Sequence, residues 1–184
     1  MNLLEIKSKA LICQRCRLSS TRKNVVFGNG NIISKIMMVG EAPGAEEDEQ
    51  GKPFVGPAGN VLNTLLNLIE IKREDVYISN LIKCRPPQNR DPLDEEIKNC
   101  GYWLLQELKI IKPKYIIALG KFATSLFFPG QTIKDAHGTS RKVGNTIFFS
   151  MYHPAYAVHN SSRAKELTED IKKFEEILRG SNGR

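Results

Sequence analysis

Apolar residues gather in four short runs along the chain, each with few charges and several β-branched side chains. The runs cover residues 35–39, 76–82, 115–119 and 146–151. Near-continuous apolar runs of this length are typical of strands buried on both faces of a parallel sheet. The pattern therefore predicts four parallel strands.

Helical patterns alternate with these runs, at residues 61–69, 94–110, 121–128 and 164–178. The second pattern has acidic residues in its first turn, as a helix N-terminus prefers. The last repeats Leu167, Ile171 and Phe174 at helical spacing. Four alternations of strand and helix predict an α/β fold with helices on both faces of the sheet.

In such a fold, ligands bind beyond the carboxyl ends of the strands. An unusual loop rich in Gly, Pro and acidic residues, GEAPGAEEDEQGKPFVGPAGN (residues 40–60), follows the first strand. Asn80 ends the second strand, Gly120 follows the third and His153 follows the fourth. We expect these segments to meet at one edge of the sheet and to form the site.

Length and composition indicate one globular domain over residues 1–184, because 41% hydrophobic and 26% charged residues are ordinary values. The chain has no apolar run of membrane-spanning length and no signal peptide at its start, so we expect a cytoplasmic protein with no membrane partner. We also expect a monomer. The net charge of +7 favours a polyanionic partner such as nucleic acid.

Four cysteines in such a chain favour metal or redox chemistry over disulfides. Cys13 and Cys16 form a CxxC pair, whereas Cys84 and Cys100 lie much farther along the chain, with 15 residues between them. Four thiolates can hold zinc or an iron–sulfur cluster, and sequence spacing separates these two poorly. At this point both remain open.

The residues at the strand ends favour a nucleobase over a phosphate. Carboxylates in the 40–60 loop would repel a phosphate, and the run 46–49 is typical of a solvated loop or helix turn. The amide of Asn80 offers a donor beside an acceptor, which matches uracil N3–H and O4. Phe54, in a loop held by Gly and Pro, can present an exposed ring for stacking on a base.

The segments GEAPGAEEDEQGKPFVGPAGN, SNLIKCRPP and HPAY, with the four cysteines in this order, resemble the family 4 uracil-DNA glycosylases of archaea and thermophilic bacteria. The resemblance runs from Cys13 to about Tyr156. It implies a three-layer α/β/α sandwich around a four-stranded parallel sheet, uracil-containing DNA as the partner and a [4Fe–4S] cluster as the cofactor. It also implies a repair reaction that flips uracil out of DNA and hydrolyses its N-glycosidic bond.

The resemblance also implies site residues. The cluster ligands would be Cys13, Cys16, Cys84 and Cys100, and the uracil pocket would comprise Gly40, Glu41, Ala42, Phe54, Asn80 and His153, with His153 as the catalytic donor to uracil O2. Ala42 and Gly44 stand where the first glycosylase family has its water-activating Asp and its thymine-blocking Tyr. We therefore take Glu41 as the group that orients water, and Glu47 as a weaker candidate to exclude a 5-methyl group.

Two further expectations concern the DNA surface. The loop 155–158 after His153 can wedge into the gap that a flipped base leaves. Basic residues are expected to meet phosphates: Lys83, Arg85, Arg141, Lys142 and Arg163. Two other interpretations stay open from the residues alone, namely a non-catalytic zinc module that binds nucleic acid and a hydrolase that uses Mg²⁺ in the acidic loop.

Overall fold

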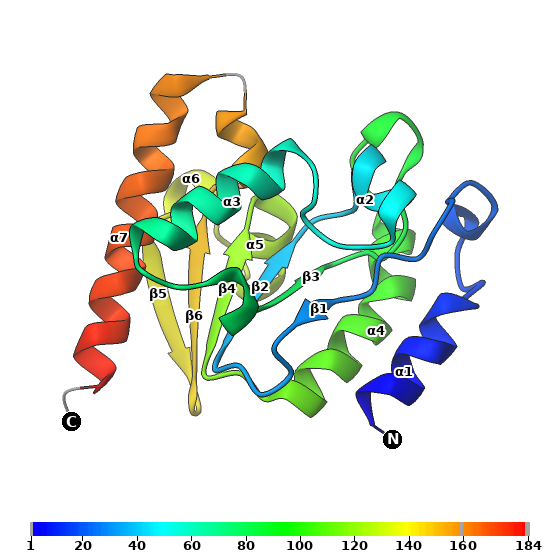
Figure 1. Cartoon of the computed structure of the whole chain (residues 1–184), viewed down its shortest axis with the longest axis horizontal. Helices are drawn as coiled ribbons and strands as arrows, with labels where there is room; N and C mark the ends of the chain where they lie inside the picture. The colour runs from blue at the N-terminus through cyan, green and yellow to red at the C-terminus, as the bar shows by residue number, and fades with distance from the viewer. Residues whose placement is uncertain (1, 159, 183–184) are drawn as a thin grey trace.

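A computed structural model describes residues 2–158 and 160–182. A six-stranded sheet forms its centre, in the order β1-β3-β2-β4-β6-β5 (Figure 1). The strands are β1 (Asn29–Gly30), β2 (Ile36–Gly40), β3 (Tyr77–Asn80), β4 (Tyr115–Leu119), β5 (Thr139–Val143) and β6 (Thr146–Met151).

The four predicted strands are the parallel centre of this sheet, β3-β2-β4-β6. The expected strand count was wrong, because β1 pairs antiparallel with β3 at one edge and β5 pairs antiparallel with β6 at the other. Neither edge strand has the apolar pattern from which the other strands were predicted. β1 has two residues, and all five residues of β5 are exposed. The α/β class itself is confirmed.

Within the described residues, seven α-helices accompany the sheet. They are α1 (Leu3–Leu11), α2 (Ala45–Gln50), α3 (Pro57–Leu68), α4 (Asp94–Ile111), α5 (Lys121–Phe127), α6 (Ile133–Ala136) and α7 (Ser161–Asn182). Short 3₁₀ turns occur as η1 (Arg17–Ser20), η2 (Arg73–Asp75), η3 (Pro87–Asn89) and η4 (Pro154–Ala157). The four predicted helices correspond to α3, α4, α5 and α7. The pattern missed α1 and α6, and it predicted only a solvated loop or a helix turn where α2 forms.

Alternate strand residues point to two separate cores, which makes three layers. Met38 of β2 packs with side chains of α3 and α7 on one face. Its neighbours Met37 and Val39 pack with α4 and α5 on the other. A third cluster, around Phe27 and Trp103, joins α1 to α4 beside the four cysteines.

In the sheet order, the connection from β2 leads toward one edge, to β3, and the connection from β4 leads toward the opposite edge, to β6. A crevice at the carboxyl ends of strands is expected where connections diverge in this way. The connections that begin there carry the residues of the site. Among the described residues, no helix combines the length and apolar character needed to cross a bilayer.

Candidate active site

A pocket of about 580 Å³ lies at the carboxyl ends of β2, β3 and β6. Its lining includes five of the six residues expected to bind a base, namely Glu41, Ala42, Phe54, Asn80 and His153. The sixth, Gly40, lies directly beneath them. The fold therefore brings together side chains that are more than a hundred residues apart in the sequence.

Asn80 is the most deeply buried polar group of the pocket, with 1% of its surface exposed. Its Oδ1 atom is buried and has no hydrogen-bond partner among the described residues. An unpaired buried acceptor costs about 1–3 kcal/mol, so such groups are rare in folded proteins. The orphan oxygen marks the position where a ligand donor would lie.

Gly40 lies opposite Asn80 in the β2–β3 register, and its lack of a side chain leaves room for the Asn80 amide. A Cβ atom at Gly40 would lie 2.4 Å from Asn80 Oδ1 and 2.7 Å from the Phe54 ring. Both contacts are shorter than packed atoms tolerate. A side chain at this position would therefore displace the amide, the ring or both.

Phe54 forms a wall of the pocket in a strained conformation, with φ at +53°. Its ring is only 5% exposed and faces the His153 ring, with 5.5 Å between centroids and 29° between planes. The expectation of an exposed ring was wrong, since the ring also packs into the core under α3. Gly59 makes room for it, because a Cβ there would lie 2.0 Å from the Phe54 carbonyl oxygen.

His153 follows β6 and caps the turn η4. The backbone N–H of Ala155 donates to His153 Nδ1 at 3.2 Å. Burial, opposed only by the charge of Glu47, lowers the pKa of His153 to about 4, so the ring is neutral at physiological pH. Because Nδ1 accepts a hydrogen bond, the single ring proton lies on Nε2, which is then available as a donor.

Glu47 organises the loop rather than facing solvent. Its Oε1 accepts from the N–H groups of Val55 (2.9 Å) and Gly56 (2.8 Å), and its Oε2 accepts from Gly44 N–H at 3.1 Å. The carboxylate thus ties the start of α2 to the loop that carries Phe54. These bonds hold the group in place at the lining of the pocket.

The neighbouring Asp48 is also buried and accepts from the N–H groups of Lys23 and Asn24. The prediction that the acids at 46–49 are simply solvated was therefore wrong for Glu47 and Asp48. It holds for Glu46 and Glu49, which are exposed. Backbone donors that need an acceptor become visible only once the loop is folded.

Glu41 lies at the pocket rim immediately after β2. Burial and the charge of Asp91 raise its pKa to about 7, against the opposing effect of Lys121. Lys121 itself pairs with Asp91 at 2.5 Å. The Glu41 carboxyl can therefore exchange a proton near neutral pH, which is the range where an acid–base group works best.

Two further residues that line the pocket were not predicted. Asn89 and Arg90, from the segment after Cys84, also line the pocket. Gln88 and Asn89 both adopt positive φ, and Arg85 Nε donates to Asn89 Oδ1 at 2.7 Å. The PPQN tetrapeptide signalled a turn but not its proximity to the pocket, because that depends on how the turn folds back.

The four cysteines are free thiols and line one small cavity. Cys13 and Cys16 follow α1, Cys84 lies between β3 and η3, and Cys100 lies on α4. Three of them accept hydrogen bonds. Trp103 Nε1 donates to Cys13 Sγ (3.2 Å), Lys83 N–H to Cys100 Sγ (3.1 Å) and Arg22 Nη1 to Cys84 Sγ (3.5 Å). Donors around sulfur suit thiolate ligands.

Burial raises the pKa of the thiols of Cys16, Cys84 and Cys100, to about 12 for Cys100, and the charges of the neighbouring cysteines act in the same direction. A metal would therefore have to displace these protons on binding. Within residues 2–158 and 160–182, no three acidic, Cys or His side chains are arranged as ligands of one metal ion.

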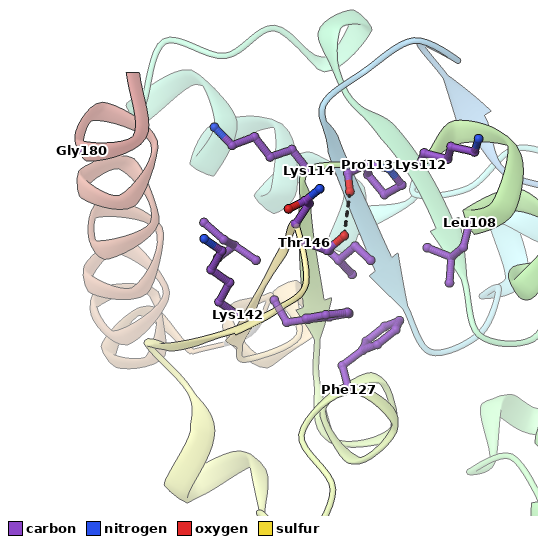
Figure 2. Close-up of a pocket in the computed structure, with 12 residues that line it drawn as sticks. Leu108, Lys112, Pro113, Lys114, Phe127, Lys142, Thr146 and Gly180 are labelled. Atoms are coloured by element: carbon purple, nitrogen blue, oxygen red, sulfur yellow. Dashed lines mark hydrogen bonds between the residues drawn. The ribbon is translucent and has the colours of Figure 1, made fainter. Parts of the chain in front are cut away.

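The basic residues expected to meet phosphates do not form one face. Lys83 is 1% exposed and pairs with Glu107, so the expectation was wrong for it. Arg141 and Lys142 lie on β5, and Lys142 lines a separate hollow of about 1030 Å³ at the amino ends of β4 and β6 (Figure 2). Lys112 and Lys114 line this hollow too, but it is remote from the strand ends that carry the site.

Aromatic side chains on both sides of His153 in the sequence contact one another. The rings of Tyr152 and Tyr156 stack at 4.6 Å, and the Arg163 guanidinium lies 4.6 Å from the centroid of Tyr156. The His137 ring also contacts the Tyr152 ring, with 4.3 Å between centroids, and His137 pairs with buried Asp170 at 3.0 Å. This column supports η4 beside the pocket.

Comparison with known proteins shows the family to which this chain belongs. The family model of the uracil DNA glycosylase superfamily matches residues 27–179. The chain therefore belongs to the uracil DNA glycosylase superfamily, as the sequence resemblance predicted.

Several relatives are type-4 uracil-DNA glycosylases. The protein of Saccharolobus solfataricus is 43% identical over 96% of this chain and 87% of its own length. The protein of Thermotoga maritima is 42% identical over 96% and 95%, and that of Archaeoglobus fulgidus is 40% identical over 96% and 93%. This chain is similar to type-4 enzymes over nearly its whole length.

The raised pKa of Glu41 predicts a pH-dependent cost in stability. Between pH 4.5 and 7 the folded chain binds this proton more tightly than the unfolded chain, so the free energy of unfolding falls as pH rises through that range. Glu41→Gln should remove the cost. In urea denaturation we expect the variant to exceed the wild type by about 1–3 kcal/mol at pH 8, after discounting for partial exposure, and to match it near pH 4.

The control is Glu49→Gln, which removes an exposed carboxylate of the same loop. It should leave the dependence of stability on pH unchanged. A Glu41→Gln variant that gains no stability at pH 8 would show that the carboxyl is not held at a raised pKa.

Proposed function

We propose that this chain excises uracil from DNA with Asn80 as the base reader, Phe54 as the stacking wall and His153 as the donor to uracil O2. The observation that carries the proposal is the orphan Oδ1 of Asn80. It lies in a pocket whose other walls are an aromatic ring and a neutral imidazole. Such a pocket is suited to a flat, uncharged base with polar edges.

The target base has to leave the DNA stack before it can enter this pocket. Flipping costs a few kcal/mol and costs least for a mispaired base, such as uracil opposite guanine. Once inside, uracil N3–H can donate to Asn80 Oδ1 while the amide N–H₂ donates to O4. Cytosine has no proton on N3 and an amino group at C4, so it mismatches both positions.

Bond cleavage leaves negative charge on the departing base and positive charge on the sugar. His153 Nε2–H can stabilise the charge that develops at O2, as a donor in an oxyanion hole does. A neutral ring suffices for this role, which agrees with its pKa near 4.

Glu41 supplies the complementary charge. As a carboxylate, it can favour the cationic sugar and orient the attacking water, and its pKa of about 7 lets it hold the proton that the water loses. A lyase step would need an amine nucleophile. Among the described residues, no lysine lines the pocket, so we propose that the reaction ends with free uracil and an abasic site.

We further propose that the four cysteines hold a [4Fe–4S] cluster. Four thiols around one cavity, with hydrogen-bond donors to three sulfurs, fit a thiolate-ligated cluster. When bound, it would supply metal–thiolate bonds that tie the N-terminal segment, the loop after β3 and α4 together. Hydrolysis of a glycosidic bond transfers no electrons, so the role is structural.

Asn80→Asp tests the reader. A carboxylate repels uracil O4 but accepts from the amino group of cytosine, so uracil release should fall and discrimination against cytosine should weaken, both measured on matched oligonucleotides. Asn60→Asp, the same change at an exposed position of α3, is the control and should behave as wild type. A variant that keeps full uracil activity and full discrimination would rule out Asn80 as the reader.

His153→Ala tests the donor. Single-turnover cleavage should fall by about 10²–10³-fold, the usual loss for one such group. Affinity for uracil-containing DNA should change much less, because phosphate contacts dominate binding. Lower pH should not restore the rate, whereas His153→Gln, which keeps an N–H donor, should recover part of it. Loss of binding at an unchanged cleavage rate would instead make His153 a structural residue.

Metal analysis of anaerobically purified protein tests the cluster. We expect about four iron atoms per chain. Cys100→Ser should lower both the iron content and the melting temperature. One zinc ion per chain without iron would contradict the cluster and leave the uracil pocket unaffected.

A further inference from the structure

A buried ion pair lies directly behind the pocket, between Lys83 and Glu107 of α4. Lys83 Nζ and Glu107 Oε2 are 2.6 Å apart, and the two side chains are 1% and 0% exposed. Burying two charges costs about as much as their attraction returns, so an apolar pair of similar volume would often serve stability equally well. The pair therefore calls for a reason other than stability.

Each charged group has all of its hydrogen bonds satisfied. The three ammonium protons of Lys83 point to Glu107 Oε2, to Ser79 Oγ at 2.5 Å and to the backbone carbonyl of Asn80 at 2.8 Å. Glu107 also accepts from Gly28 N–H, Tyr77 hydroxyl and Ser79 hydroxyl at 2.9–3.0 Å. Fully satisfied networks of this kind are rigid.

The bond to the Asn80 carbonyl matters because the Asn80 side chain has no anchor at Oδ1. The direction of the amide is then set by its backbone. On one side the backbone is held by the register with Gly40 and by the bond from Leu81 N–H to Gly40 O at 2.9 Å. On the other side it is held by the Lys83 ammonium.

Lys83 also reaches the cysteine site, through its backbone and not its side chain. Its N–H donates to Cys100 Sγ at 3.1 Å. Changes to the side chain therefore leave this bond in place. The two roles of the residue can be separated by experiment.

We propose that Lys83 and Glu107 are positioning residues that hold the backbone of Asn80, and so aim its amide at the base. This inference rests on the proposed role of Asn80 as the reader. It assigns a part in base recognition to two side chains that do not touch the base.

The test is the double variant Lys83→Met/Glu107→Gln. The Gln oxygen can still accept from Gly28 and Tyr77, and its N–H₂ can replace the ammonium as donor to Ser79, whose hydroxyl then loses its acceptor at Oε2. The donor to the Asn80 carbonyl is lost. Loss of a hydrogen bond from a charged group should reduce single-turnover uracil release by about 10–100-fold and weaken inhibition by free uracil by a similar factor. DNA affinity and iron content should stay within about twofold of wild type, because phosphate contacts are unchanged.

Tyr77→Phe is the matched control. It removes one hydrogen bond from the same buried carboxylate, at an oxygen that does not contact Lys83 or Ser79. We expect a similar loss of melting temperature with wild-type kinetics. If the double variant and Tyr77→Phe have equal kinetics, the network is merely structural and the proposal is wrong.

Two further measurements keep the test decisive. If the double variant does not fold, Ser79→Ala removes one ammonium acceptor while both charges stay, and it should lower the same rate by about 2–10-fold. An unchanged rate would overturn the proposal. In an Asn80→Ala background, the double variant should cause no further loss, because both changes act on one amide.

The failure of this inference can be told from the failure of the proposed function. If Asn80→Asp alters base choice but the double variant does not, Asn80 is the reader and the positioning role falls. If Asn80→Asp leaves base choice intact, the proposed reader itself is wrong.

Discussion

The parallel register that sets Gly40 of β2 opposite Asn80 of β3 is the constraint on which the site depends. Because Gly40 has no Cβ, the Asn80 amide and the Phe54 ring can approach the strand end from two sides. The β4–β6 pairing then brings His153 to the same edge, where its ring faces Phe54. A shift of one residue in either register would point these groups to the opposite face of the sheet.

Two buried glutamates turn this arrangement into a rigid one. Glu47 gathers three backbone N–H groups and holds the Phe54 loop against α2. Glu107 gathers an N–H, two hydroxyls and an ammonium behind β3. Because Glu47 and Glu107 hold the backbone around the pocket, the pocket side chains keep their positions without hydrogen bonds to one another. Asn80 Oδ1 therefore stays free for a ligand.

Much of the fold and of the pocket could be predicted, because apolar period and strand order are local properties. The central strands and α3, α4, α5 and α7 follow from them, and the ends of parallel strands then bring Glu41, Asn80 and His153 together. The edge strands could not be predicted from the same pattern. β5 is exposed throughout, and its place depends on pairing with β6.

The sequence by itself determined which residue types stand at the strand ends and which family their motifs resemble, since both are matters of order along the chain. Only the tertiary structure decided which charged groups are buried and which groups they bind. Lys83 and Glu47 belong to patterns typical of solvent-exposed residues, yet both are buried. Burial and partners come from segments far away in the sequence, as when α4 brings Glu107 to Lys83, and they set the energy of a charge.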